Sequence, residues 1–312
     1  TRWSGRGPRG LAPGRRGRHA RAMTSPVIAP AALADLLADP RTRPLDCRLT
    51  RVPQPSGPSL WASSEADWAR ARLPGARFVH MVDDLSDPAA EVPYTPPPAE
   101  ALAARLAALG IDLARDRVVT YGSGADMAAH RAWWVLAQAG AEALTLDGGI
   151  EAWTTEGRPL DRTPPSPPVP VPVPQAPPAP RPRLLADMAA VRAALEDPGT
   201  VLLNALPPEL FRGEGEQVFG RRGRIAGSRS LPAAEVVDPA TGRFRPPEAI
   251  RARLAEAGAE GRRAITYCGG GIAASTLLVA LLLAEHEAAA LYDGSLLEWG
   301  ADPAAPMETG PA

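Results

Sequence analysis

Residues 264–284 read AITYCGGGIAASTLLVALLLA, and this stretch decides the fold. Its first four residues form an apolar run of the length of a buried strand. Residues 273–284 have the length and composition of a helix, with Ala and Leu as good helix formers. Cys268 and three glycines lie between these two segments. The stretch therefore predicts a strand, a glycine-rich loop and a helix, with a thiol at the end of the strand.

The same alternation of short apolar runs and helical patterns continues on the N-terminal side of this stretch. Residues 201–204 (VLLN) are short enough for a buried strand, and residues 247–257 have helical composition. Gly258 follows the helical segment, at a position where helices commonly end. Strands that alternate with helices predict an α/β fold in which a parallel sheet carries helices on both faces.

The chain also repeats itself. Three pairs of matching residues are each 146 positions apart: Tyr121 and Tyr267, Asp147 and Asp293, and Trp153 and Trp299. Earlier matches, such as RLPGA at 72–76 with RIAGS at 224–228, have slightly larger offsets because the loops differ in length. We therefore predict two copies of one α/β domain, at residues 27–160 and 183–310.

A proline-rich stretch separates the two copies. Residues 163–182 read TPPSPPVPVPVPQAPPAPRP, which lacks most of the amide donors that a helix or a sheet requires. Such a segment favours polyproline II and acts as a semi-rigid spacer. We expect it to be the linker between the domains; a ligand for a proline-binding domain is the alternative.

Residues 1–22 carry many Arg and Gly residues and almost no large apolar side chains. They cannot bury enough surface to offset the entropy of ordering, so we expect a disordered leader. A targeting arm, a nucleic-acid-binding arm and sequence upstream of a start at Met23 are the alternatives. Before Met23 there is no apolar core of the kind found in secretory signals.

Charge and cysteine content narrow the class of protein. The formal net charge is −1, which gives no global field for nucleic acid or an acidic membrane, and the apolar run 277–284 is too short to span a bilayer. With only Cys47 and Cys268, a four-ligand structural zinc site is excluded and a disulfide framework is disfavoured. We expect a cytoplasmic protein.

Cys268 has the surroundings of a reactive thiol. It follows the predicted strand at the edge of the sheet where ligands bind in parallel α/β folds. Glycines allow successive N–H groups to face inward and form an anion-binding nest, and the N-terminus of the next helix adds partial positive charge. A thiolate held there is stabilised relative to the thiol, and the same amides would stabilise a persulfide anion. For Cys47 we expect burial as a small apolar side chain.

These residues resemble the rhodanese family of sulfurtransferases in its tandem-domain form. The resemblance rests on residues 267–274 (YCGGGIAA), which are similar to the active-site loop of the family, and on residues 291–303 (LYDGSLLEWGADP). The segments 211–214 (FRGE) and 307–310 (METG) also fit. The resemblance implies a catalytic C-terminal domain at 183–310 and an inactive N-terminal domain at 27–160, because Gly122 stands where the second copy has its cysteine.

The resemblance also implies the site residues. Cys268 is the catalytic residue, and the loop residues Gly269, Gly270, Gly271, Ile272 and Ala273 bind the donor. Arg212 matches a substrate-binding arginine of the family, and a second is expected at Arg221 or Arg222. A guanidinium suits a carboxylate or sulfonate because its N–H groups form a planar fork. His80, with Asp83 or Asp84, lies in a segment that reaches the cleft in relatives, where His80 is a candidate base.

The loop departs from both substrate subclasses of the family. Thiosulfate-preferring members carry basic side chains directly after the cysteine, where this chain has Gly269 and Gly270. Mercaptopyruvate-preferring members have a neutral loop, closer to this one, but commonly place Ser at the position of Gly270. The sequence therefore leaves the donor open between thiosulfate and 3-mercaptopyruvate.

We expect a ping-pong reaction through a persulfide on Cys268, with cyanide, a small thiol or a thioredoxin-like protein as acceptor and with no metal or organic cofactor. A sulfur carrier or regulatory binding protein without turnover is the alternative. A tyrosine phosphatase is disfavoured because Ala274 stands where its transition-state arginine would be. A dinucleotide-binding module is disfavoured because GGGIAA lies near the end of its domain rather than at the first strand.

Overall fold

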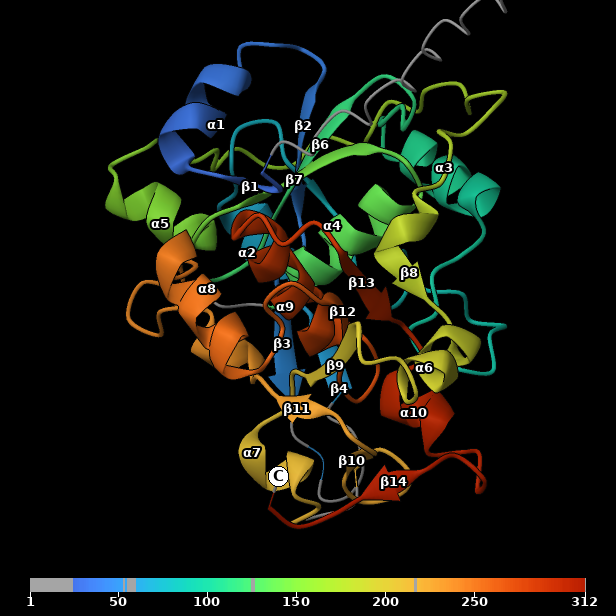
Figure 1. Cartoon of the computed structure of the whole chain (residues 1–312). Coiled ribbons are helices and arrows are strands. Elements are labelled where there is room, and N and C mark those ends of the chain that lie inside the picture. Colours follow the sequence, from blue (N-terminus) through green and yellow to red (C-terminus); the bar gives the residue numbers. More distant parts are fainter. Residues whose placement is uncertain (1–24, 53, 55–59, 125–126, 216–217, 312) are drawn as a thin grey trace, which may run out of the picture.

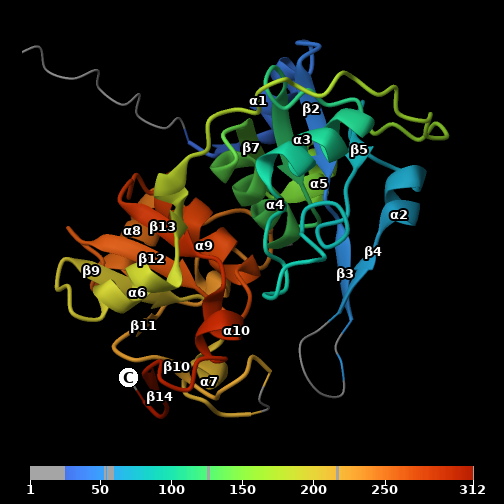
Figure 2. The same ribbon diagram turned by 90° about the vertical axis from the view of Figure 1, so that its right-hand side faces the viewer.

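The computed structural model describes residues 25–311 except 53, 55–59, 125–126 and 216–217. The expected leader, residues 1–22, lies outside this range. The described chain forms two parallel five-stranded sheets with helices around them (Figure 1). In Figure 2 the first half of the chain, blue to green, lies above the second half, yellow to red.

The first sheet has the strand order β1-β7-β6-β2-β5, and all its neighbouring strands are parallel. In that order the strands are Val27–Ile28, Glu142–Leu146, Arg117–Tyr121, Thr42–Asp46 and Arg77–Phe78. The helices of this half are α1 (Pro30–Leu36), α2 (Glu65–Arg70), α3 (Ala99–Ala108), α4 (Met127–Gln138) and α5 (Gly149–Thr155). A hairpin of β3 (Leu49–Val52) and β4 (Leu60–Ser63) extends from this half and runs beside the second half (Figure 2).

The second sheet repeats this topology with the order β8-β13-β12-β9-β11, again entirely parallel. Its strands are Leu185–Ala186, Ala289–Tyr292, Arg263–Tyr267, Thr200–Asn204 and Arg229–Ser230. Its helices are α6 (Met188–Ala194), α7 (Pro208–Phe211), α8 (Pro247–Glu256), α9 (Ile272–Leu283) and α10 (Ser295–Trp299), with 3₁₀ turns at Pro182–Leu184 and Ala233–Glu235. A small antiparallel pair joins β10 (Arg224–Ile225) to β14 (Met307–Glu308).

The elements expected from the sequence appear within one residue of their predicted bounds. The strand expected at 201–204 is β9, and the helix expected at 247–257 is α8. Gly258 follows α8 with φ of 72°, the left-handed conformation that closes many helices and that glycine adopts without strain. The predicted α/β fold with two copies of one parallel sheet is confirmed.

Residues on neighbouring positions of β6 show why helices cover both faces of the first sheet. Val118 packs in the core cluster that includes residues of α3 and α4, whereas Val119 packs in a second cluster with Leu33 of α1 and Trp153 of α5. Side chains of a strand alternate between the faces, so both faces of β6 are buried. An uninterrupted apolar run such as VV is typical of a central parallel strand.

The two halves meet through α4 and α9, which lie at the centre of the molecule in Figure 1. Helix α9 is apolar around its whole circumference, as expected for a helix without a solvent face. Helix α4 is equally buried, but it carries His130 and Arg131. His130 Nδ1 lies 2.9 Å from Thr276 Oγ1, and burial lowers the pKa of His130 to about 4. A neutral imidazole therefore lies at the contact between the halves.

The proline-rich stretch lies against the first half rather than free in solvent. The amide of Val171 donates to the carbonyl of Ala107 at 2.9 Å, and the amide of Arg181 donates to the carbonyl of Gln138 at 2.7 Å. A side chain at Gly140 would collide with the backbone of Ala179. The stretch is thus docked along the ends of α3 and α4, and glycine permits the close approach.

Among the described residues, no helix is both long and apolar enough to cross a membrane. The same part of the chain contains no group of three or more His, Cys, Asp or Glu side chains that could hold a metal ion.

Candidate active site

Cys268 directly follows β12, the middle strand of the second sheet. The loop 269–271 then leads into α9, and Gly271 caps that helix with φ of 78°. The Cys268 residue is only 3% exposed. The predicted order of strand, glycine loop and helix is confirmed, and it places the thiol at the carboxyl edge of the sheet in front of a helix of 12 residues.

Ser295, the first residue of α10, holds both ends of this loop. Its Oγ accepts hydrogen bonds from the amides of Cys268 and Gly271, each at 3.1 Å, and donates to the carbonyl of Tyr292 at 2.9 Å. Ser295 has φ of 49°, an unusual value for a residue with a side chain. The hydroxyl thus replaces backbone partners that the tight loop does not have.

The amides of the loop divide into two groups. The amide of Gly271 is committed to Ser295, so this glycine contributes its left-handed conformation rather than a donor for the substrate. The amides of Gly269, Gly270, Ile272 and Ala273 have no acceptor within the described part of the chain. Unpaired N–H groups at a helix N-terminus are suited to an anion.

Three side chains cover the outer surface of the loop. The ring of Phe219 lies on Gly269, where a Cβ atom would collide with it. A Cβ atom at Gly270 would be 2.9 Å from Leu297 Cδ1 and 3.1 Å from the ring of Tyr94. The neighbours therefore require glycine at both positions and leave no room for the basic side chains of other subclasses.

Tyr94 comes from the first half of the chain, in the loop before α3. It has φ of 70°, and its side chain packs in an apolar group with Trp61 of β4, Ile272 of α9 and Met127 of α4. Burial raises the pKa of the Tyr94 phenol, and its hydrogen bond with Trp61 opposes this effect. Both halves of the chain therefore form the surroundings of Cys268.

The expected substrate-binding arginines already have partners. The Arg212 guanidinium forms two hydrogen bonds with the Glu214 carboxylate, at 2.8 and 2.7 Å. Arg221 donates to backbone carbonyls after α10, among them Asp302 at 2.7 Å and Ala305 at 2.6 Å. Arg222 donates to the carbonyl of Gly215. The structure thus gives Arg221 a structural role, because its donors hold the turn after α10.

His80 contacts groups of the first half. Its Nδ1 lies 2.9 Å from Asp83 Oδ2, and its Nε2 lies 3.3 Å from the carbonyl oxygen of Trp61. Asp84 accepts a hydrogen bond from the amide of His80 at 2.7 Å. Trp61, whose carbonyl oxygen His80 contacts, belongs to the apolar group of Tyr94 and Ile272.

The equivalent loop of the first half follows β6 and has Gly122 in place of the cysteine. The carbonyl of Gly122 accepts from the amide of Ile150 at 2.9 Å, just as the carbonyl of Cys268 accepts from Leu296 at 3.1 Å. The amide of Gly124, however, donates to Glu151 Oε2 at 2.6 Å. This loop therefore binds a carboxylate of its own domain.

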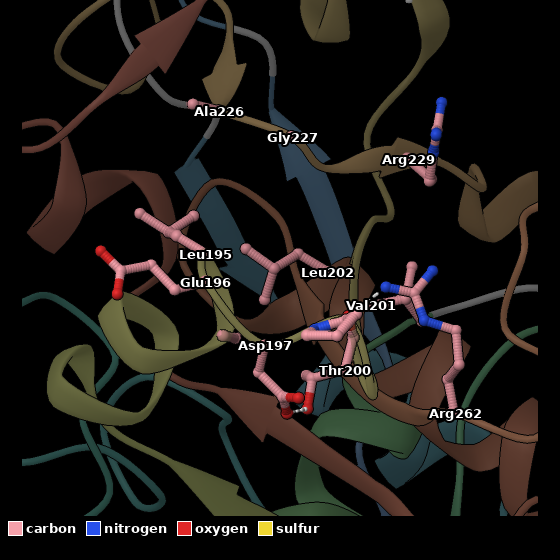
Figure 3. A pocket seen from close by; sticks show the side chains of 12 residues that line it. Leu195, Glu196, Asp197, Thr200, Val201, Leu202, Ala226, Gly227, Arg229 and Arg262 are labelled. Carbon is pink, nitrogen blue, oxygen red and sulfur yellow. Dashed lines mark hydrogen bonds between the residues drawn. The ribbon is translucent and has the colours of Figure 1, made fainter.

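A hollow of about 290 Å³ lies elsewhere in the second half (Figure 3). It is formed by Leu195, Glu196 and Asp197 after α6, by the first residues of β9, by Gly227 and by the arginines Arg229 and Arg262. Because Thr200 begins β9 and pairs with Arg263, this hollow lies at the amino ends of the strands, opposite to Cys268. It takes no part in the site.

Ser295 and Tyr94 were not predicted from the sequence as site residues. Ser295 lies in the segment 293–295 (DGS), which the repeat relates to 147–149 (DGG), and the exchange of Gly149 for Ser295 is a signal that could have identified it. Tyr94 carries no such signal, because its position depends on how the two halves dock.

Known proteins resemble this chain over most of its length. The model of the rhodanese-like domain matches residues 29–156 and 187–302. A probable 3-mercaptopyruvate sulfurtransferase of Pseudomonas aeruginosa is 34% identical over 288 residues, covering 89% of this chain and 96% of the relative. A putative thiosulfate sulfurtransferase of Mycobacterium tuberculosis is 33% identical over 262 residues, covering 81% of this chain and 89% of the relative.

Solved structures show the same fold. SseA from Escherichia coli, described as a 3-mercaptopyruvate sulfotransferase with the rhodanese fold, matches with a TM-score of 0.73 at 25% identity, covering 87% of this chain and 99% of SseA. The anaerobic ergothioneine biosynthesis enzyme of Chlorobium limicola matches with a TM-score of 0.77 at 21% identity, covering 92% of this chain and 70% of the enzyme. The chain therefore belongs to the rhodanese family, as a sulfurtransferase built from two rhodanese-like domains.

Proposed function

We propose that the chain transfers sulfane sulfur from thiosulfate or 3-mercaptopyruvate to cyanide or a thiol acceptor through a persulfide on Cys268. The observation that carries the proposal is the thiol at the end of β12, followed by four amides in the loop and the first turn of α9 that have no acceptor among the described residues. The names of the relatives support the two donors. We assign cyanide, a small thiol or a thioredoxin-like protein as the acceptor class.

In the first half-reaction the Cys268 thiolate attacks the outer sulfur of the donor. With thiosulfate the S–S bond of the donor breaks and sulfite leaves with the bonding electron pair. With 3-mercaptopyruvate the C–S bond breaks, the electron pair goes to carbon, and this carbon takes up a proton to give pyruvate. The amides of Gly269, Gly270, Ile272 and Ala273 stabilise the anionic sulfur in both states of the enzyme.

In the second half-reaction the acceptor attacks the outer sulfur of the persulfide. The S–S bond of the persulfide breaks, and Cys268 leaves as the thiolate that began the cycle. Cyanide gives thiocyanate, and a thiol gives a persulfide of the acceptor. The enzyme alternates between two anionic forms of one residue at one electrostatic site, so no further cofactor is needed.

The arginines have a narrower role in this proposal than the sequence suggested. Arg212 binds the acid group of a donor only if it exchanges Glu214, its present partner. Arg221 supports the site indirectly, because its hydrogen bonds fix the turn that follows α10.

Intact-mass measurement after incubation with each donor tests the proposal. We expect a gain of one sulfur atom in the wild type and none in Cys268→Ser, with release of sulfite or pyruvate in steady state when an acceptor is present. A wild-type protein that never gains sulfur would refute the proposal. A protein that gains sulfur but does not turn over with any acceptor would be a carrier rather than an enzyme.

A further inference from the structure

Arg131 of α4 is a buried cation that the proposed reaction does not use directly. Its side chain is 1% exposed, and its NH1 atom lies 2.5 Å from Asp293 Oδ1 across the contact between the domains. Its guanidinium is stacked on the ring of Trp134 at 4.5 Å. Burial of a charge is costly unless it is paired, so a specific arrangement must offset it.

The ion pair lies directly against the end of the cysteine loop. A Cβ atom at Gly271 would be 2.8 Å from Asp293 Oδ1 and 2.9 Å from Arg131 NH1. Gly271 is the last residue of the loop, and its amide is held by Ser295, which also holds the amide of Cys268. The Asp293 carboxylate is therefore a negative charge beside the loop that must stabilise an anionic sulfur.

Arg131 also holds the residue that covers the loop. Its NH2 atom donates to the carbonyl of Tyr94 at 2.6 Å. Tyr94 has the positive φ of 70°, a conformation that costs free energy for a residue with a Cβ atom and persists only when its surroundings fix it. The ring of Tyr94 then packs on Gly270. One guanidinium thus contacts groups on two sides of the loop.

Among the described residues, the equivalent aspartate of the first domain has no buried cation beside it, but the partly exposed Arg243. Asp147, which the repeat relates to Asp293, accepts from the backbone amide of Phe244 at 2.9 Å. Next to it, Arg243 is paired with Glu156 on the surface. A buried arginine is therefore present only at the aspartate beside the loop that carries the thiol.

We propose that Arg131, which belongs to the domain whose loop has Gly122 in place of the cysteine, is a positioning residue of the Cys268 site that neutralises Asp293 and fixes Tyr94 over the loop. This inference rests on the proposed function, since it concerns the anionic sulfur of Cys268. It gives the first domain a part in the chemistry of the second. The domain without a thiol in its loop supplies the charge that lets an aspartate lie beside an anionic nucleophile.

The charged and titratable groups around the loop come from both domains. The first domain contributes Arg131 and Tyr94. The second contributes Asp293, the preceding Tyr267, whose hydroxyl contacts Ser228, and Glu298 of α10, which packs on Gly294. Asp293 and Arg131 are the charged groups at the Cα atom of Gly271, so they are the pair to alter.

The test is the pH dependence of Cys268 alkylation by iodoacetamide in four proteins: wild type, Arg131→Met, Asp293→Asn and the double variant. In Arg131→Met the carboxylate is unpaired, and we expect the alkylation rate at pH 7 to fall about 10-fold. In the double variant the rate should return to within about 3-fold of wild type. Peptide mass mapping assigns the label to Cys268 rather than to Cys47.

Arg131→Lys separates the two parts of the proposal. It keeps the charge but not the planar fork, so we expect a nearly normal alkylation profile with a lower rate of persulfide formation. If Arg131→Met does not fold, Asp293→Asn alone still decides, because loss of the carboxylate should raise the alkylation rate at pH 7.

The proposal is overturned if Arg131→Met folds and keeps the wild-type pH profile, if the double variant is no better than Arg131→Met, or if Asp293→Asn leaves the rate unchanged. These outcomes differ from failure of the proposed function, which would appear as a wild-type enzyme that gains no sulfur from any donor.

Discussion

The loops after β6 and β12 each follow a tyrosine at the end of an equivalent strand, Tyr121 and Tyr267, yet their amides have different partners. In both loops the carbonyl of the residue after the tyrosine accepts a hydrogen bond from an amide of a later helix. The donor is Ile150 of α5 in the first domain and Leu296 of α10 in the second. The first loop then donates its Gly124 amide to Glu151, whereas Leu297 stands at the corresponding position of the second domain. The first domain thus keeps the backbone contact of the loop but pairs its Gly124 amide with a carboxylate, whereas the amide of Gly270, at the corresponding position beside the thiol, has no acceptor among the described residues.

The largest effect should come from moving the thiol from one loop to the other. In the double variant Cys268→Ser with Gly122→Cys we expect sulfur transfer to fall about 10³-fold or more, because the nucleophile is lost and the first loop has its amide at Gly124 occupied. Persulfide formation is followed by intact mass. A persulfide on residue 122 at wild-type yield would show that the fold alone activates the thiol.

Ser295→Ala tests the second difference between the loops, because it removes a hydroxyl that has no counterpart at Gly149, the equivalent residue of the first domain. Two buried amides, those of Cys268 and Gly271, would lose their acceptor, and we expect a loss of about 4 kcal/mol in the free energy of unfolding. Denaturant titration measures it. Ser275→Ala is the matched control, because Ser275 only donates back to the carbonyl of Gly271 and should cost about 1 kcal/mol or less.

In the helices that follow the two loops, one pair of equivalent positions carries His130 and Thr276. Burial lowers the pKa of His130 in the folded chain to about 4, below the ordinary histidine value of 6.5, so the unfolded chain binds a proton first as the pH falls. The stability from the neutral imidazole is complete above pH 6.5 and is lost between 6.5 and 4, by about 3 kcal/mol. We expect His130→Asn to flatten this slope in denaturant titrations, while His286→Gln should retain it.

The smallest effect is expected at the carboxylate of the first loop. Glu151→Leu gives this position the residue of the second domain and frees the Gly124 amide near the surface. Surface substitutions of this kind change stability by about 0.5 kcal/mol or less, and sulfur transfer at Cys268 should not change. A large loss of activity would show that the first loop communicates with the second.

The repeat, the strands and the place of the Cys268 thiol could be predicted from the sequence because each depends on local pattern. The sequence itself shows the apolar run from Ala264 to Tyr267, the glycines after Cys268 and the 146-residue spacing of the repeat. Each of these features depends on residues that are close together in the sequence or on equivalent positions of the repeat. Gly258 ended α8 for the same local reason.

The rest of the site could not be predicted because it depends on contacts between distant segments. Arg131 and Tyr94 reach the cysteine loop only through the docking of the two domains. Arg212 and Arg221 are expected at the substrate from the sequence, whereas in the fold Arg212 pairs with Glu214 and Arg221 donates to the carbonyls after α10. Residue type alone does not say which acceptor a guanidinium will find.

His130 and Thr276 touch although they are 146 residues apart, which is the spacing of the repeat. Equivalent positions that face one another lie on a local two-fold axis, the geometry of an isologous homodimer. Two separate identical chains would have to place the same side chain on both sides of that axis. Fusion into one chain removes this constraint, so a buried imidazole can face a hydroxyl, and one domain can have glycine in its loop where the other has the thiol.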